Sequence, residues 1–180
     1  MIRSYKQTDN GFIRTVDKDS SEEDWNDAVW LDLLTPTYEE LDRVGKVVEL
    51  EMPSRDEMRE IESTSRLYTE DGARFMTTTV LSRVDTETPE PAEITFILLD
   101  KRIITIRHTD SYSFRVFALQ LLNRHRILSR DKIFLALLEK IVDLHAAVLD
   151  RFGTVLDPHA KNVFVGRNEK VHNENTTPPP

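Results

Sequence analysis

Cysteine is absent from the 180-residue sequence, and glycine is scarce. Without cysteine the chain can form neither a disulfide nor a thiolate zinc site, which favours a cytoplasmic environment. The five glycines are too dispersed for a dinucleotide-binding fingerprint or a P-loop, so no organic cofactor is expected. No G-x-S-x-G or H-E-x-x-H motif occurs, and the five histidines lack metal-ligand spacing.

Long apolar runs are absent as well. The longest stretches without a charged residue are Phe75–Ser82 and Val116–Asn123, each of eight residues. A membrane helix requires roughly 20 apolar residues. The amino terminus also lacks the apolar run of a signal peptide. We therefore expect a chain that neither spans a bilayer nor is exported.

Charge is plentiful but unevenly spread. The net charge is -8, with 22 acids and 8 bases in residues 17–99 and 8 bases and 2 acids in residues 101–132. The acidic balance disfavours nucleic acid as a partner, and Phe114 and Phe117 have the spacing of a helix core rather than of a base-stacking surface. The basic segment leaves a local anion or partner site open.

Seven apolar or alternating segments predict strands. Asn10-Gly11 and Asp71-Gly72 are favoured hairpin turn pairs, and Asp100-Lys101 is a third tight connection. We expect Arg66–Glu70 to pair antiparallel with Arg74–Arg83, and Ile94–Leu99 with Arg102–His108. The predicted strands are IRSYKQ, FIRTV, AVWLDLL, RLYTE, ARFMTTTVLSRV, ITFILLD and RIITIRH, and an acidic loop, DKDSSEED, precedes the third.

The remaining segments predict helices. TPTYEELDRVGKVVEL has Thr35 as a cap and Pro36 at the first helical position, and a short helix follows from Ser54 to Glu62. A further helix covers 111–127, and a longer one begins near Arg130. The long helix should bury one stripe, expose Asp143 and end or kink at Pro158. The stripe begins with Ile133, Leu137, Ile141 and Leu144.

Acidic residues are the one abundant type of chemically functional side chain, and carboxylates are suitable ligands for hard cations such as Mg²⁺. Ser54-Arg55-Asp56-Glu57 also reads as a capping box, in which Ser54 and Glu57 bond reciprocally and Asp56 complements the helix dipole. From the residues alone, capping is favoured over metal binding for Glu57, and Asp56 is left open. Asp143 belongs to an acidic stripe that is typical of a solvated helix face.

The ordered set WLDLLTPTYEELDRV, MPSRDEMREIE, RLYTEDGARFMTTTVL, ITFILLDKRIITIRH and IFLALLEKIVDLHAAVLDRF resembles the cytoplasmic amino-terminal domain of the CorA family of divalent-cation transporters. The resemblance runs from about residue 1 to 157. It implies an α/β fold, with a mixed seven-stranded sheet in an α/β/α sandwich followed by a helical segment that is a truncated stalk. The implied divisions are 1–128 for the α/β cytoplasmic domain, 129–157 for the helix toward the stalk and 158–180 for an irregular tail.

The resemblance also implies a regulatory Mg²⁺ site between neighbouring subunits of a pentamer. The family's acid pair aligns with Asp56 and Glu57, in reversed order, and its further acid on the helix after the sheet aligns with Asp143. The membrane helices and the Gly-Met-Asn signature are missing from this sequence, so we expect no pore in it and contact with a membrane only through the missing helices.

We therefore expect a cytosolic domain, not an enzyme, that senses divalent cations and gates a membrane part on the cytoplasmic side of the inner or plasma membrane. It should bind Mg²⁺ only weakly when isolated. One alternative is a stand-alone soluble oligomer that binds metal or docks another protein. Another is a metal-assisted hydrolase, which would need Asp32, Asp56 and Glu57 gathered in one pocket. The ion transported is left open among Mg²⁺, Co²⁺, Ni²⁺ and Zn²⁺.

Overall fold

The computed structural model describes the backbone of residues 1–16, 21–60, 66–84, 86, 88–123 and 128–173, and side chains as far as residue 154. Contacts within the chain divide it into two compact units. The first is Met1–Val142, and the second is Asp143–Pro180.

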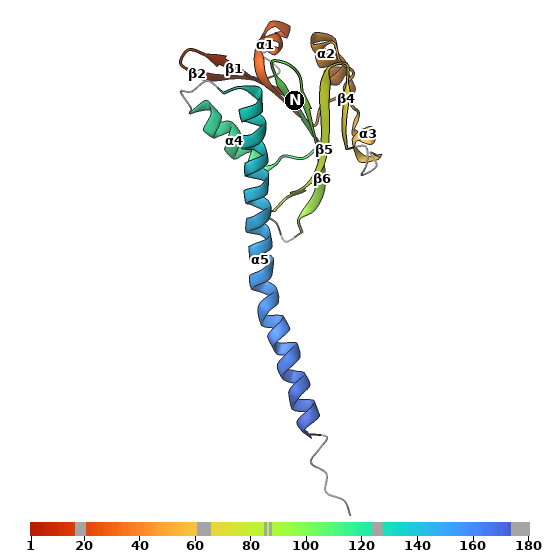
Figure 1. Ribbon diagram of the computed structural model, residues 1–180, viewed down its shortest axis with the longest axis vertical. Helices are drawn as coiled ribbons and strands as arrows, with labels where there is room; N and C mark the ends of the chain where they lie inside the picture. The colour runs from red at the N-terminus through yellow and green to blue at the C-terminus, as the bar shows by residue number, and fades with distance from the viewer. Residues whose placement is uncertain (17–20, 61–65, 85, 87, 124–127, 174–180) are drawn as a thin grey trace, which may run out of the picture. The chain divides into compact units, whose positions relative to one another are not determined.

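A seven-stranded mixed sheet forms the centre of the first unit (Figure 1). The strand order is β2-β1-β3-β7-β6-β5-β4, in which β3 and β7 run parallel and every other neighbouring pair is antiparallel. The predicted number of strands and the mixed sheet are confirmed. The strands are β1 (Ile2–Thr8), β2 (Gly11–Val16), β3 (Ala28–Leu34), β4 (Leu67–Glu70), β5 (Ala73–Ser82), β6 (Glu90–Leu98) and β7 (Ile103–Arg107).

Two of the three predicted hairpins form as expected. β4 and β5 pair across Asp71 and Gly72, which both adopt positive φ angles (47° and 77°), as a type I′ turn requires. β6 and β7 are also antiparallel, and the amide of Leu99 donates to the carbonyl of Arg102 at their connection.

The first hairpin turns one residue earlier than the sequence predicted. Thr8 pairs with Gly11, so that Asp9 and Asn10 form the turn, and Gly11 (φ 129°) begins β2. This register places Phe12 in the core, where it is 7% exposed. A slip of one residue would move Phe12 to the opposite face, so burial fixes the register more strongly than the turn pair does.

Helices cover both faces of the sheet, which confirms the α/β/α sandwich. On one face Tyr5, Trp30 and Phe96 pack with α4 (Tyr112–Leu122) and the first turns of α5 (Arg130–Asn173). The opposite face is covered by α1 (Glu22–Asn26), α2 (Tyr38–Val48) and α3 (Arg55–Glu60), which lie on the other side of the sheet in Figure 1. Each of these helices buries at least one apolar side chain, namely Trp25, Leu41, Val44 and Met58.

The buried stripe of α5 has the predicted phase. Ile133, Leu137 and Ile141 are buried, at 0%, 0% and 7% exposure. Asp143 is exposed, as expected, whereas Leu144 is half-buried rather than largely buried. The helix begins at Arg130, but the boundary between the two units falls inside it, after Val142. The domain boundaries at residues 128 and 157 stay a prediction.

Three further local predictions were wrong. Glu22–Asp24, expected in the acidic loop DKDSSEED, is the start of α1, because Ser21 and Asp24 form a capping box. The N-cap of α2 is Thr37 rather than Thr35, because Thr37 and Glu40 form a second capping box while the Thr35 amide donates to the Arg107 carbonyl.

The third concerns Pro158, where we expected α5 to end or kink, and an end at this residue is wrong. The helix α5 continues through this residue to Asn173, so residues 158–173 are not the expected irregular tail. A proline removes one backbone donor from a helix, and the backbone of α5 is nevertheless helical on both sides of Pro158. The last residues of the expected tail, 174–180, lie outside the described residues.

Candidate metal-binding site

The predicted acid pair lies on the short helix α3. The amide of Ser54 donates to Oε2 of Glu57 at 2.7 Å, and the amide of Glu57 donates to Oγ of Ser54 at 3.3 Å. The capping box is therefore real. These bonds from Ser54 lower the pKa of the Glu57 carboxyl, because they stabilise its charged form.

Capping leaves part of this acid pair free for other ligands. Both Asp56 and Glu57 are exposed, and the cap uses one of the two carboxylate oxygens of Glu57. Met58, the next residue, is 2% exposed and packs into the core below the helix. Buried Met58 therefore anchors α3 to the sheet, while the two acids face solvent.

The described residues contain no group of three or more His, Asp or Glu side chains that could hold a metal ion. A carboxylate pair supplies one or two of the oxygen ligands that Mg²⁺ takes, and the ion keeps several waters or takes oxygens from elsewhere. Asp56 and Glu57 are neighbours on α3 and both are exposed, but the structure does not group them with a third acid or histidine among the described residues. Asp143, the third predicted ligand, is exposed on α5 at the start of the second unit.

A hydrolase would need Asp32 beside Asp56 and Glu57, but Asp32 instead forms a buried ion pair. Its carboxylate is 1% exposed and accepts hydrogen bonds from Nε and Nη2 of Arg107 at 2.9 and 2.7 Å. Burial acts to lower the pKa of the Arg107 guanidinium, but the carboxylates of Asp32 and Asp110 together outweigh it, and the net result is a raised pKa for Arg107. An acid in this position is structural rather than available in an open pocket.

The hydrogen bonds of Asp32 extend along the parallel pair of strands. The hydroxyl of Thr105, which pairs with Asp32 across the strands, donates to Oδ1 of Asp32 at 3.0 Å. The indole nitrogen of Trp30 donates to the same hydroxyl at 3.0 Å. The sequence did carry a signal for this network, since Asp32 and Arg107 are opposite charges in two otherwise apolar strands.

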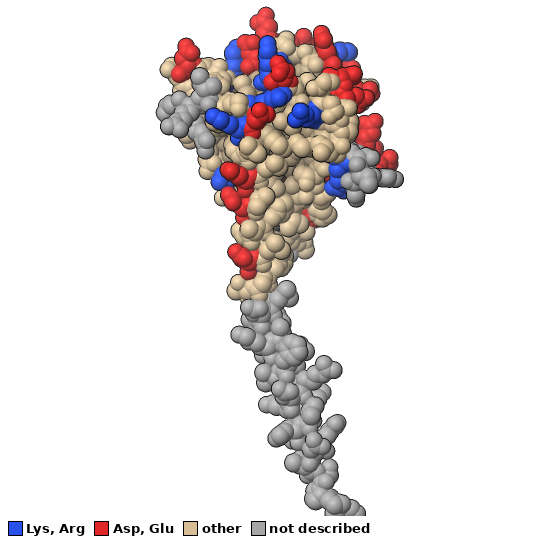
Figure 2. All heavy atoms as spheres, in the orientation of Figure 1, with Lys and Arg blue, Asp and Glu red and all other residues tan. Residues whose placement is uncertain are grey.

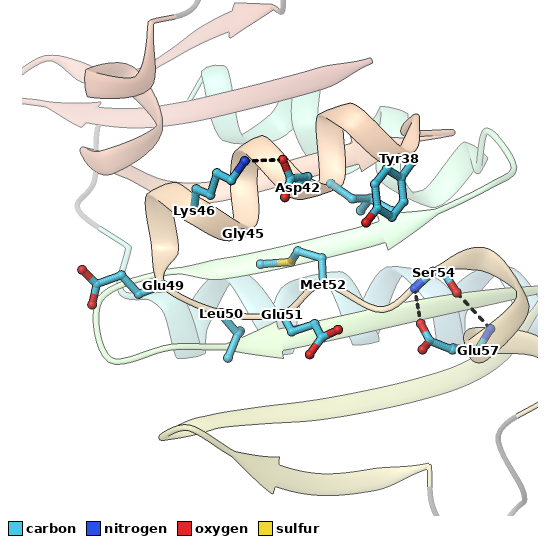
Figure 3. Close-up of a pocket in the computed structure, with 11 residues that line it drawn as sticks. Tyr38, Asp42, Gly45, Lys46, Glu49, Leu50, Glu51, Met52, Ser54 and Glu57 are labelled. Atoms are coloured by element: carbon cyan, nitrogen blue, oxygen red, sulfur yellow. Dashed lines mark hydrogen bonds and ion pairs between the residues drawn. The ribbon is translucent and has the colours of Figure 1, made fainter.

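A groove with a volume of about 530 Å³ lies beside the acid pair (Figure 3). Its walls are α2 and the segment 49–54, which leads into α3, and Glu57 stands at one end. Sequence reasoning did not find this groove, because it depends on how closely residues 49–54 approach α2. More widely, acidic side chains gather over the region where Figure 1 places α1, α2 and α3 (Figure 2).

Comparison with known proteins gives a consistent picture. Residues 25–176 match the family described as "CorA-like Mg2+ transporter protein". The chain is 22% identical over 175 residues to a protein named magnesium transport protein CorA from Haemophilus influenzae, an alignment that covers 97% of this chain and 55% of that protein. The chain thus spans about half the length of the curated relatives it matches.

Solved structures share the fold. The soluble domain of CorA from Methanocaldococcus jannaschii superposes with a TM-score of 0.66 at 14% identity, covering 92% of this chain and 65% of that one. The ZntB cytoplasmic domain from Vibrio parahaemolyticus gives 0.60 at 12% identity, with 87% and 63% covered. In the part of this chain that the structure describes, no helix is both long enough and apolar enough to cross a membrane.

Proposed function

This chain belongs to the CorA-like Mg²⁺ transporter family, and on that premise we propose that it is the cation-sensing, gating part of a divalent metal-ion transporter. The curated relatives are nearly twice as long as the aligned segment. The proposal gives residues 1–180 a regulatory, non-catalytic role and places ion passage in membrane helices outside them. It places the segment on the cytoplasmic side of that membrane.

The observation that supports the proposal is the exposed pair of acids in the first turn of α3. Glu57 uses Oε2 to accept from the Ser54 amide, and Asp56 beside it is exposed. Because Mg²⁺ takes six oxygen ligands, two exposed carboxylates supply only part of its coordination shell. We assign the completing acid to Asp143 of a neighbouring copy, so that the site forms only on assembly.

The distribution of charge supports an assembly of this kind. Residues 17–99 are strongly acidic and residues 101–132 are basic, so each copy carries segments of opposite charge. Head-to-tail packing around a ring brings unlike surfaces of adjacent copies together. The proposed assembly is a homopentamer of the full-length protein, with Mg²⁺ between subunits.

Titration calorimetry of the 180-residue chain with MgCl₂ tests whether the site is incomplete within one copy. An exposed site with few carboxylates binds at roughly 10⁻⁴ to 10⁻³ M or more weakly. We expect this weak range for the isolated chain. Micromolar binding that disappears in the Asp56→Asn, Glu57→Gln double variant would show a complete site within one copy and would contradict the proposed sharing between subunits.

A further inference from the structure

The groove beside α3 has an apolar floor. Leu41 and Leu50 are 7% and 6% exposed, and Met52, which is half-buried, lies between the two walls in Figure 3. At Gly45 a Cβ atom would lie 2.7 Å from the carbonyl oxygen of Leu50. The missing side chain therefore lets the segment 49–54 approach α2 closely, and the Leu50 amide donates to the Gly45 carbonyl at 3.0 Å.

The rim of the groove is acidic. Four carboxylates and one ammonium line it, and the ammonium, Lys46 Nζ, lies 2.6 Å from Oδ2 of Asp42. Glu49 and Glu51 are exposed, and the side chain of neither forms a hydrogen bond or ion pair within the described part of the chain. Glu57 uses only Oε2 for its cap. Three carboxylates with free acceptor capacity thus lie along the groove, with Glu49 and Glu57 toward its two ends (Figure 3).

This combination does not suit a bare metal ion. The acids are spread along the groove, and the described residues contain no cluster of three that could hold one ion. A hydrated Mg²⁺ would also gain nothing from Leu41, Leu50 and Met52. A ligand that matches both features carries several positive charges separated by apolar segments, because each ammonium meets a carboxylate while the carbon chain covers the floor.

We propose that the groove binds an aliphatic polyamine, with its ammonium groups on Glu49, Glu51 and Glu57 and its methylene chain against the floor. Tyr38, which is 81% exposed at the α2 wall, supplies an aromatic ring at the groove on which a further ammonium can bind. The volume of about 530 Å³ is within the range of small-molecule sites. Binding requires neither Asp56 nor a neighbouring copy, and it shares only Glu57 with the proposed magnesium site.

The test is a spermidine titration of the 180-residue chain, followed through the amide NMR signals of the groove. We expect a Kd of about 1 mM at low salt, because exposed charge pairs contribute little each. The Glu49→Gln, Glu51→Gln variant should raise this Kd about fivefold. The matched control is Glu22→Gln, Glu23→Gln on α1, which removes two exposed acids away from the groove and should leave the Kd unchanged.

A second pair of titrations separates polyamine binding from simple charge screening. Cadaverine and Mg²⁺ carry the same charge, but only cadaverine has methylenes for the floor. We expect cadaverine to shift the signals of Leu50 and Met52 and Mg²⁺ to leave them in place, and Met52→Gln should weaken cadaverine binding about threefold. Equal effects of the two cations, or a spermidine Kd that Glu49→Gln, Glu51→Gln does not change, would overturn the proposal. Both variants keep Asp56 and Glu57, so failure here leaves the magnesium proposal standing.

Discussion

Asp32 on β3 and Arg107 on β7 form a buried, bidentate ion pair across the parallel strands of the sheet, with both side chains 1% exposed. Arg107 Nη1 also donates to the Thr109 carbonyl and to Oδ1 of Asp110, and its guanidinium lies 4.7 Å from the centre of the Phe114 ring. The pair thereby connects the centre of the sheet to the start of α4.

Breaking this pair from one side should destabilise the chain strongly. Arg107→Met leaves the buried Asp32 carboxylate with only the longer ion pair to Arg3 Nη1 at 3.4 Å, a cost of about 3–5 kcal/mol in the free energy of unfolding. The joint variant Asp32→Leu, Arg107→Met should recover much of that loss, because no charge is then left buried alone. Urea denaturation measures the free energy of unfolding of the single and the joint variant. The exposed pair Arg83–Glu90 is the control, and its loss should cost at most about 1 kcal/mol.

The cap of α3 predicts a dependence of stability on pH. The folded chain has a Glu57 pKa below the ordinary value of 4.5, so the stability that Glu57 contributes is present above that value and is lost as the pH falls below it. Glu57→Gln keeps a side-chain acceptor for the Ser54 amide but has no charge. The Tm of the wild type should exceed that of Glu57→Gln at pH 7, and the difference should shrink toward pH 3. A difference that does not depend on pH would contradict the charged cap.

The phenol of Tyr5 should ionise at a higher pH than that of an ordinary tyrosine. Burial, and next the Asp32 carboxylate, raise the pKa of its phenol from 10.0 to about 12. A raised folded pKa means that the associated stability is complete below pH 10 and is lost as the pH rises toward 12. Ultraviolet absorbance should show a late step in the titration of the four tyrosines, and Tyr5→Phe should remove that step. A titration complete near pH 10 in the folded protein would contradict this burial.

The close approach at Gly45 predicts that the groove is sensitive to one methyl group. A Cβ atom at this position would meet backbone rather than a side chain, so the segment 49–54 must shift. Gly45→Ala should lower the free energy of unfolding by about 1–3 kcal/mol, as overpacking does. Chemical denaturation measures this loss. Gly153→Ala is the control, because its Cβ would meet no atom within 4 Å, and Gly153→Ala should not be destabilising.

Much of the fold was predictable because its signals are local. Alternating apolar residues on either side of Asp71-Gly72 predicted a hairpin that forms with the expected turn, and the spacing of Ile133, Leu137 and Ile141 predicted the buried face of α5. The errors arose where two local signals competed. Thr35 and Thr37 both qualify as caps, and the contact between Thr35 and Arg107, distant in sequence, decides between them.

The candidate site was predictable only in part. The capping box and the exposure of Asp56 follow from four consecutive residues, and the structure has both. Two features were not predicted, because each depends on contacts between distant segments. One is the groove, which forms only when residues 49–54 pack beside Gly45. The other is the ion pair of Asp32, which needs β3 and β7 to be neighbours although 68 residues separate their ends.

The central claim is that Asp56 and Glu57 sense Mg²⁺ in an assembled transporter. Its most direct test is limited proteolysis of the full-length protein over a range of Mg²⁺ concentrations. The variant Asp56→Asn, Glu57→Gln removes both charges and retains an acceptor for the cap, and Glu22→Gln, Glu23→Gln serves as the control for lost acidic charge. We predict that the α3 variant needs a higher Mg²⁺ concentration for protection, while the control behaves as the wild type. Protection of the α3 variant at the wild-type Mg²⁺ concentration would contradict the claim and leave the two acids with only their role at the start of the helix.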